Sequence, residues 1–338
     1  MQRLLLFLFC IPFLGITQNS HTINTIGNTF YPNSLTINIG DTVNWVNTGG
    51  SHNVNATLVT FPNNPEGFGN AVSSSAWTFQ WVFTLSGTYD YQCDPHAGMG
   101  MVGQVIVNSI PALTFIPDDW FEQALINLGY DDVLDDSVLT SNINTVTHLN
   151  LSPYAPGAAH LPIDDLTGIE DFISLIDLDC RGNDLNNIDL SQNSALTILN
   201  CSGNYLSSLD LSFNSGLTYL DCSGNKLPSL DLIHQTALTY LDCSFQTEYA
   251  SQISGTPWLQ NLNISNCTSL IEIYCQDNVI DSLDVSAITS LTTLHCEENQ
   301  LTSLNVSNNS ILTTLQCGFN QLSSLFTSGA DSLTTLNC

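Results

Sequence analysis

The feature that most limits the fold of this chain is a cysteine that returns every 21 residues along its second half. One run consists of Cys180, Cys201, Cys222 and Cys243, and a second run with the same step consists of Cys275, Cys296, Cys317 and Cys338. A fixed period of this length is typical of a solenoid, in which each repeat contacts only its neighbours. We therefore expect residues 146–338 to form stacked repeats, and we call these eight residues the cysteine ladder.

The residues around each ladder cysteine follow a recognisable pattern. The repeat that starts at Leu196 reads LTILNCSGNYLSSLDLSFN, which matches L-x-x-L-x-C-x-x-N-x-L. In this pattern the chain resembles the leucine-rich repeat family. The resemblance implies a leucine-rich repeat solenoid, in which an asparagine three residues after the cysteine hydrogen-bonds the turns. These asparagines are Asn183, Asn204, Asn225, Asn278, Asn299 and Asn320.

The repeat pattern is interrupted once and ends abruptly. Cys243 and Cys275 are 32 residues apart, so the extra residues predict a loop that carries Tyr249 and Trp258. Such a loop is a candidate for ligand contact, although insertions in solenoids are often merely tolerated. The sequence stops at Cys338 inside a repeat, without a polar cap, and we expect a fragment of a longer solenoid.

Three readings of the cysteine ladder differ in their chemistry. Stacked strands lie about 4.8 Å apart. At this spacing the cysteines could form a metal–thiolate strip, or they could form disulfides, for which the separation is slightly long. The third reading, which we favour, treats each cysteine as a small apolar core residue. A second stacked series, Asp189, Asp210 and Asp231, could be held by calcium or by backbone N–H groups, and we expect the latter.

A short helix is predicted immediately before the repeats, in the segment IPDDWFEQALINLGY. Asp118 can cap its first turn and Gly129 can end it. Phe121, Leu125 and Leu128 fall on one helical face. We expect residues 110–145 to form a helical N-terminal cap of the solenoid.

The region before this helix has a different pattern. Residues 19–109 contain short alternating segments such as SLTINI and TVNWVN, separated by turn residues such as Gly40 and Gly87. This pattern indicates an antiparallel β-sandwich. We therefore expect a multidomain chain, with an all-β sandwich, a short helical cap and a solenoid.

Four residues of the sandwich have the chemistry of a copper site. The segment YDYQCDPHAGMGMVGQVIV places Cys93, His96 and Met101 on one loop, and His52 stands far upstream in GGSHNVN. A thiolate and two imidazoles suit copper in both oxidation states, and a weak thioether tunes the reduction potential. We predict that these four residues bind one type 1 copper ion. The remaining histidines have no partner at metal spacing; they are His21, His148, His160, His234 and His295.

The same residues resemble the plastocyanin, pseudoazurin and halocyanin members of the cupredoxin family, which have an upstream histidine and then C-x-x-H-x-x-x-x-M. The resemblance implies a Greek-key sandwich and a blue copper site for electron transfer. It also implies that Asn53 hydrogen-bonds across to the cysteine loop and stiffens the site. Met99 would fit the shorter spacing of the amicyanin branch. We assign the axial position to Met101, because V-G-Q-V follows it in the register of the family.

The charge of the chain limits its partners. It has 31 acidic residues against three Lys and Arg. Residues 19–109 hold only four of the acids: Asp41, Glu66, Asp90 and Asp94. Nucleic acids and anionic membranes are bound mainly through Lys and Arg, so the composition excludes both as partners. We expect a cationic redox protein, and a protein or glycan ligand for the repeats.

The first residues predict export. Arg3 precedes an apolar run from Leu4 to Leu14, and residues 1–18 match a cleaved signal peptide. No apolar run is long enough for a membrane span. We expect a secreted or cell-surface protein, with the periplasm as the alternative.

Two functions from different classes fit this sequence. The first is an extracellular one-electron carrier whose repeats bind a surface or a partner. The alternative is an adhesin, or a copper-capturing or copper-sensing protein, whose copper domain has no redox partner. We expect no enzyme, because the chain has no nucleophile motif, phosphate loop or zinc-protease helix.

Overall fold

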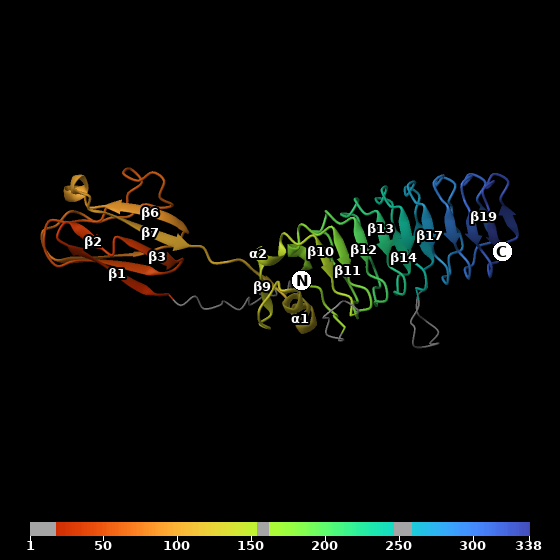
Figure 1. The fold of residues 1–338 in the computed structure, drawn as a ribbon, viewed down its shortest axis with the longest axis horizontal. Coiled ribbons are helices and arrows are strands. Elements are labelled where there is room, and N and C mark those ends of the chain that lie inside the picture. The colour runs from red at the N-terminus through yellow and green to blue at the C-terminus, as the bar shows by residue number, and fades with distance from the viewer. Residues whose placement is uncertain (1–17, 154–161, 247–258) are drawn as a thin grey trace, which may run out of the picture. The chain divides into compact units, whose positions relative to one another are not determined.

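The computed structural model describes residues 18–153, 162–246 and 259–338. The chain divides into two compact units, Met1–Pro111 and Ala112–Cys338, which we call the N-terminal unit and the coil unit (Figure 1). The predicted signal peptide lies outside the described residues apart from its last residue, and so do His160 and the loop with Tyr249 and Trp258. None of the helices in the described ranges is long and apolar enough to cross a bilayer.

The N-terminal unit contains two small sheets. Its elements are β1 (Ser20–Ile26), β2 (Thr29–Tyr31), β3 (Ser34–Asn38), β4 (Thr42–Asn47), β5 (Trp77–Val82), β6 (Gly87–Gln92), the 3-10 helix η1 (Asp94–Met99) and β7 (Val102–Asn108). One sheet has the order β2-β1-β4-β5 and the other has the order β3-β7-β6. The predicted alternation is present in β4, where Val43, Trp45 and Asn47 are buried and the residues between them are half-buried.

The strand directions correct the expectation of a purely antiparallel sandwich. β1 pairs with β4 in parallel, and β3 pairs with β7 in parallel. The other pairs, β1–β2, β4–β5 and β6–β7, are antiparallel. Alternating apolar residues specify which face of a strand is buried, but they say nothing about the direction of its neighbour. The sequence pattern therefore predicted a sandwich of β-strands, but it did not predict which neighbouring strands run parallel.

Aromatic rings fill the core between the two sheets. The ring of Trp45 lies 5.4 to 6.4 Å from the rings of Phe68, Phe79, Phe83 and Tyr91, measured between centroids. Aromatic side chains bury large areas, and tilted contacts of this kind add to the stability of a core. Tyr91 belongs to β6, so the strand that leads to the cysteine loop is anchored in this core.

The coil unit begins with short elements and continues as stacked coils, each coil carrying one strand of a long sheet. The first elements are β8 (Leu113–Phe115), α1 (Asp119–Leu128), β9 (Ser137–Leu139) and α2 (Thr140–Ile143). The coils carry β10 (His148–Asn150), η2 (Ile169–Asp171), β11 (Asp177–Asp179), β12 (Ile198–Asn200), β13 (Tyr219–Asp221), β14 (Ser229–Asp231), β15 (Tyr240–Asp242), β16 (Asn261–Asn263), β17 (Glu272–Tyr274), β18 (Thr293–His295), β19 (Ser303–Asn305), β20 (Thr314–Gln316), β21 (Ser324–Phe326) and β22 (Thr335–Asn337).

The predicted helix is present as α1. It begins after Asp118, whose side chain accepts two backbone N–H groups of the first turn at 2.8 and 2.9 Å. It ends at Gly129, which has a left-handed φ of 81°. Phe121 and Leu125 are buried as predicted, but Leu128 is 44% exposed and lies off the core face.

Nine coil strands form one parallel sheet in the order β10-β11-β12-β13-β15-β17-β18-β20-β22 (Figure 1). The middle residue of each strand is Leu or Ile and lies in register with the next, as Leu199 does with Leu220. All of these are buried except Leu336 in β22. Full burial of one such side chain contributes about 1.5–3 kcal/mol, so the stacked leucines dominate the stability of this unit.

The cysteine ladder lies in the same core. Its members are free thiols, and all are buried except Cys338. Burial raises the pKa of the seven buried ladder thiols, for Cys180 to about 12, so these seven are protonated and behave as apolar core residues. Cys267, which lies off the ladder, is also free and buried, and its Sγ donates to the backbone oxygen of Leu232 at 3.2 Å.

Amide side chains join successive coils as the family resemblance implied. The Nδ2 of Asn204 donates to the backbone oxygens of Cys180 and Cys201, each at 3.0 Å. In the coil of Cys243 this role falls to Gln246, whose Nε2 donates to the oxygen of Cys222 at 2.8 Å. The sequence prediction did not include Gln246, because the repeat pattern has asparagine three residues after the cysteine and this coil has glutamine there.

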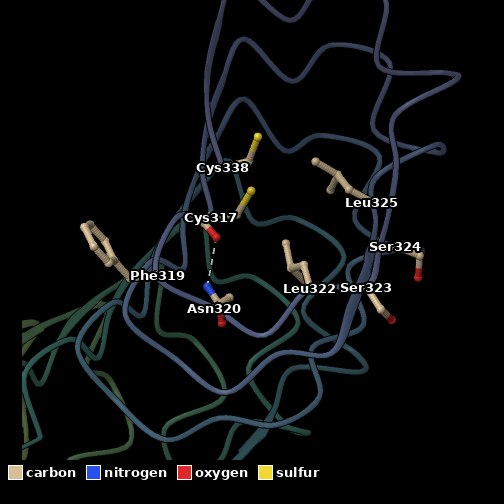
Figure 2. Close-up of a pocket in the computed structure, with 8 residues that line it drawn as sticks. All are labelled: Cys317, Phe319, Asn320, Leu322, Ser323, Ser324, Leu325 and Cys338. Atoms are coloured by element: carbon tan, nitrogen blue, oxygen red, sulfur yellow. Dashed lines mark hydrogen bonds between the residues drawn. The ribbon is translucent and has the colours of Figure 1, made fainter.

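The last coil contains a hollow of about 290 Å³ (Figure 2). Its walls include Leu322, Leu325 and the last two ladder cysteines, Cys317 and Cys338, whose sulfur atoms point the same way. The side chain of Asn320 donates to the backbone oxygen of Cys317 at 3.0 Å, as in the earlier coils.

Candidate metal centre

The four predicted ligands are positioned by the sheets of the N-terminal unit. His52 stands between β4 and β5, where its backbone N–H and C=O pair with those of Ser73 at 3.2 and 3.1 Å. Cys93 directly follows β6, His96 lies in η1, and Met101 directly precedes β7. Because β6 and β7 are paired, both ends of the loop that carries the last three are fixed.

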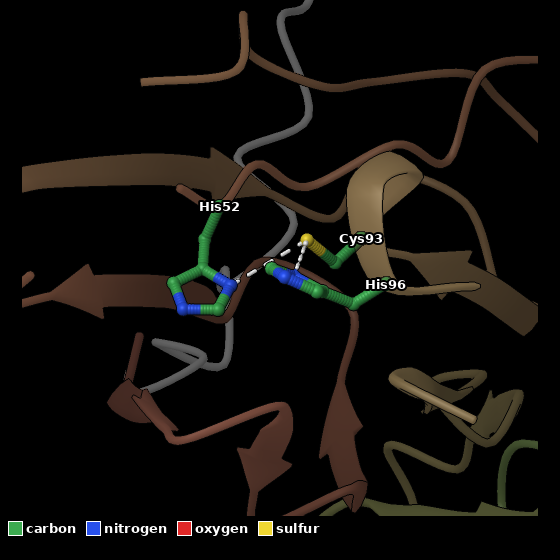
Figure 3. Close-up of side chains that lie close together, drawn as sticks. All are labelled: His52, Cys93 and His96. Carbon is green, nitrogen blue, oxygen red and sulfur yellow. Dashed lines mark hydrogen bonds between the residues drawn. The ribbon is translucent and has the colours of Figure 1, made fainter. Parts of the chain in front are cut away.

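Three donor atoms converge at this place. The Sγ of Cys93 lies 3.6 Å from the Nδ1 of His52 and 3.4 Å from the Nδ1 of His96. Figure 3 shows that both rings turn the same nitrogen toward the sulfur. The ligand atoms of the three residues lie within 4.8 Å of one another, and no other group of three His, Cys, Asp or Glu side chains in the described ranges meets that distance.

This donor set fits copper. One thiolate and two imidazole nitrogens form the trigonal set that copper accepts in both oxidation states. Cys93 and His52 are almost completely buried, whereas His96 is half-buried. The three side chains can therefore hold one copper ion that is shielded from bulk water on most sides.

Burial controls the protonation of the ligands. It raises the pKa of the Cys93 thiol, although backbone hydrogen bonds from Asn53 and His96 oppose the effect. It lowers the pKa of His52, and the neighbouring ring of His96 lowers it further. His52 is thus neutral and able to offer a lone pair, whereas binding of a metal to Cys93 displaces the thiol proton.

Asn53 ties the two ligand-bearing segments together. Its Oδ1 accepts the backbone N–H of Asp94 at 2.8 Å, and its Nδ2 donates to the Asp94 carboxylate at 2.8 Å. Asn55 donates to the other carboxylate oxygen at 2.7 Å. Burial would raise the pKa of Asp94, but these hydrogen bonds and one from Gln92 outweigh it and lower the pKa. Asp94 and Asn55 were missed from sequence; the N-V-N spacing beside His52 was the available signal.

Gly50 makes room for the ring of His52. A Cβ atom on this residue would lie 2.6 Å from the Nε2 of His52, and its φ of 90° disfavours any side chain. The neighbouring Gly49 has open space around the same position. Gly50 therefore leaves free the space that the imidazole of His52 occupies.

The two methionines of the loop have different surroundings. Met101 is fully buried in the same core cluster as Cys93, and its backbone oxygen accepts the N–H of Cys93 at 3.0 Å. Met99 is 63% exposed, and its Sδ lies 3.7 Å from the side-chain nitrogen of Asn28. These surroundings favour Met101 as the thioether ligand.

Comparisons with known proteins place part of the chain in a copper-binding family. The family described as "Copper binding proteins, plastocyanin/azurin family" matches residues 18–108. Plastocyanin from Scenedesmus fuscus is 36% identical over 83 residues, which are 23% of this chain and 85% of that protein. Pseudoazurin from Paracoccus pantotrophus is 34% identical over 103 residues, 30% of this chain and 69% of that protein. The chain spans 57% of the chloroplastic plastocyanin of Chlamydomonas reinhardtii, with 38% identity.

Two solved structures are similar to parts of this chain. The functional domain of InlJ from Listeria monocytogenes, whose description includes a cysteine ladder, has 28% identity and a TM-score of 0.44 over 68% of this chain and 57% of that chain. An amicyanin structure has 27% identity and a TM-score of 0.22 over 26% of this chain and 80% of that chain. The family match and the pseudoazurin and plastocyanin relatives show that this chain belongs to the plastocyanin/azurin family of copper-binding proteins.

Proposed function

We propose that the protein is a secreted type 1 copper protein that carries single electrons. Its ligands are His52, Cys93, His96 and Met101. The observation that carries the proposal is the convergence of both Nδ1 atoms on the Sγ of Cys93, at 3.6 and 3.4 Å. Copper held by such a set supplies a one-electron couple between Cu(I) and Cu(II).

The protein's own residues meet the needs of a carrier. The Asn53–Asp94 hydrogen bonds and the β6–β7 pair hold the ligands in place, so they need to move little when the charge changes. Buried Cys93 and His52 exclude water from the site. The half-buried ring of His96 is the route by which electrons leave. The chain acts as a carrier and not as an enzyme.

We propose further that residues 110–145 cap a leucine-rich repeat module formed by residues 146–338. The nine-stranded parallel sheet and the amides that join successive coils support this assignment. The module binds a protein or glycan partner and keeps the carrier near it. Residues 1–18 direct export to the cell exterior or the periplasm, which is supported by their apolar run.

The test uses the exported chain loaded with Cu(II). An intense visible absorption band from the bond between the Cys93 thiolate and copper is expected, and Cys93→Ala should abolish it. Met101→Leu should change the reduction potential, whereas Met99→Leu should leave the potential and the band unchanged. A colourless protein would contradict the type 1 assignment.

A second measurement separates the two functions that the sequence left open. The reduced protein is mixed with a cationic cytochrome, and its oxidation is followed by the return of the visible band. Fast oxidation supports the carrier. Retention of the Cu(I) state, together with tight binding of the chain to cells or glycans, would instead support the adhesin or copper-capturing function.

A further inference from the structure

The long sheet of the coil unit carries a strip of half-buried aromatic rings on the face opposite its buried leucines. Tyr219 and Tyr240 stack with ring centroids 4.4 Å apart and planes 5° apart. Tyr240 lies 5.6 Å from Tyr274, and Tyr274 lies 4.9 Å from His295. These residues belong to β13, β15, β17 and β18, which are neighbours in the sheet. We call the four rings the tyrosine strip.

Carboxylates share the face of the sheet with these rings. Asp221 and Asp242 follow the first two tyrosines by two positions on their strands and are paired in register. Each uses Oδ1 to accept the hydroxyl of the following serine, at 2.7 and 2.6 Å. Within the described residues, Oδ2 of neither aspartate makes a hydrogen bond or ion pair. Glu272 also lies on this face, and its Oε2 accepts the hydroxyl of Tyr274 at 2.9 Å.

Acidic groups act on one another and on the phenols along the strip. Burial and the neighbouring Asp221 both raise the pKa of Asp242, against its bonds to serine. Burial and then Asp242 raise the pKa of the Tyr240 phenol. Arg181 pairs with Asp179 of β11 at 3.2 Å, and its charge also acts on Tyr219 at one end of the strip. Lys226 lies over the ring of Tyr205 at 4.4 Å. A partner that brings positive charge would be favoured at this face.

We propose that the tyrosine strip, with Asp221, Asp242 and Glu272, binds an extended basic segment of a partner protein. Arginine or lysine heads form charge-assisted hydrogen bonds to the unpaired Oδ2 atoms. Their apolar stems and cationic heads pack against the aromatic rings. The inference rests on the proposed role of the coil unit in binding a partner, but it is independent of the copper chemistry.

The negative charge of this face favours a basic peptide over a neutral glycan as the ligand. Both could pack on aromatic rings, but only the basic peptide gains from the negative charge of these carboxylates and from the two Oδ2 atoms that accept no hydrogen bond. The described part of the N-terminal unit, residues 18–111, has fewer carboxylates available for such a partner. Its four acids have hydrogen-bond partners within the unit, as Asp41 does with His21 and Asp90 does with Gln104. Recruitment of a basic partner therefore falls to the coil unit.

Binding of a fluorescent peptide of alternating glycine and arginine to the full copper-loaded chain tests the proposal. The double variant Asp221→Asn with Asp242→Asn should weaken binding by about tenfold or more, because it removes two charges that face the peptide. The matched control is Asp189→Asn with Asp210→Asn. These aspartates lie outside the long sheet and also accept a following backbone N–H, each at 2.9 Å. This control should change the affinity by less than about twofold.

A second pair of measurements covers the rings and the competing ligand. Tyr219→Leu with Tyr240→Leu should weaken peptide binding at low and high salt alike, and circular dichroism should confirm that the variant is folded. Equal weakening by both aspartate pairs would overturn the proposal, because it would show an effect of net charge alone. So would binding of a neutral oligosaccharide at the rings with no affinity for the peptide. A failure here leaves the visible band of the copper site unchanged, so it is distinct from a failure of the carrier function.

Discussion

At the scale of single residues, the position of the His52 ring depends on a glycine that makes no bond to copper. Gly50→Ala would place a methyl group 2.6 Å from the ring nitrogen Nε2 at a residue with φ of 90°. We expect the ring to be displaced from its position beside Cys93 and the affinity for copper to fall by about tenfold, or about 1.4 kcal/mol, which is within the range of about 1–3 kcal/mol for local strain. Competition with a chelator measures the affinity. Gly49→Ala, which meets no atom within 4 Å, should behave as the parent, and equal losses in both variants would contradict this account.

Asn53 offers a second test at this scale. Asn53→Ala removes both hydrogen bonds between the buried Asn53 side chain and Asp94, whereas the exposed Asp94 carboxylate keeps its bonds from Asn55 and Gln92. The free energy of unfolding of the N-terminal unit should fall by about 1–3 kcal/mol. Urea unfolding of the copper-free chain, followed by near-UV circular dichroism, measures it. Asn108→Ala, which loses one exposed bond of 3.3 Å to Asn38, should cost less than about 0.5 kcal/mol.

Sequence alone could identify the donors of the site but not its supports. Cys93, His96 and Met101 stand close together in the chain, and few other functions explain that combination. Aspartate, asparagine and glycine are common in all proteins, so the residue types of Asp94, Asn55 and Gly50 did not indicate a role beside the copper site. Their importance comes from contacts between segments about forty residues apart, such as Asn53 with Asp94, which only the folded chain reveals.

At the scale of the repeating elements, the turn position two residues after the ladder cysteine has a left-handed backbone in seven coils, from Gly182 to Phe319. Glycine holds it in early coils, as Gly203 does with φ of 63°, but Asp277 and Phe319 hold it later with φ of 55° and 54°. A glycine at either place should stabilise the coil unit by about 1 kcal/mol, because it removes backbone strain.

Asp277 adds a dependence on pH that Phe319 lacks. Burial, and then the neighbouring Glu298, raises the pKa of Asp277 to about 6. Since the folded pKa exceeds the ordinary value of 3.8, the stability of the parent falls as pH rises from there through about 6. The gain from Asp277→Gly should therefore be larger at pH 7 than at pH 4, whereas the gain from Phe319→Gly should be the same. Thermal unfolding at both pH values measures this, and identical pH profiles would be inconsistent with it.

The elements themselves were predictable where the pattern was local. The period of 21 residues gave the coils, and Asp118 with Gly129 gave the ends of α1. The parallel pairing of β1 with β4 was not predictable, because partner strands contact each other only after the chain has folded. Gln246 was overlooked for a related reason: its longer side chain reaches the same backbone oxygens that asparagine reaches elsewhere.

At the scale of the whole molecule, the two units differ sharply in charge. The 31 acids include only four in residues 19–109, and the rest repel one another along the coil unit. Salt screens such repulsion over about 10 Å at 0.1 M. Adding sodium chloride should therefore raise the melting temperature of the coil unit by several degrees and that of the N-terminal unit by less than about one degree. Calorimetry with separate transitions checks this; sucrose, a neutral osmolyte, should raise both, and equal shifts in salt would refute the charge argument.

The in-register stacking of the coils bears on how such a protein can change over evolutionary time. Each strand of the long sheet is bonded only to the strand before it and the strand after it, as β13 is to β12 and β15. Unequal recombination between the similar coding units can therefore insert or delete one whole coil while the sheet closes again around the change. A lineage could lengthen or shorten its partner-binding face in this way, one coil at a time, with the copper ligands inherited unaltered.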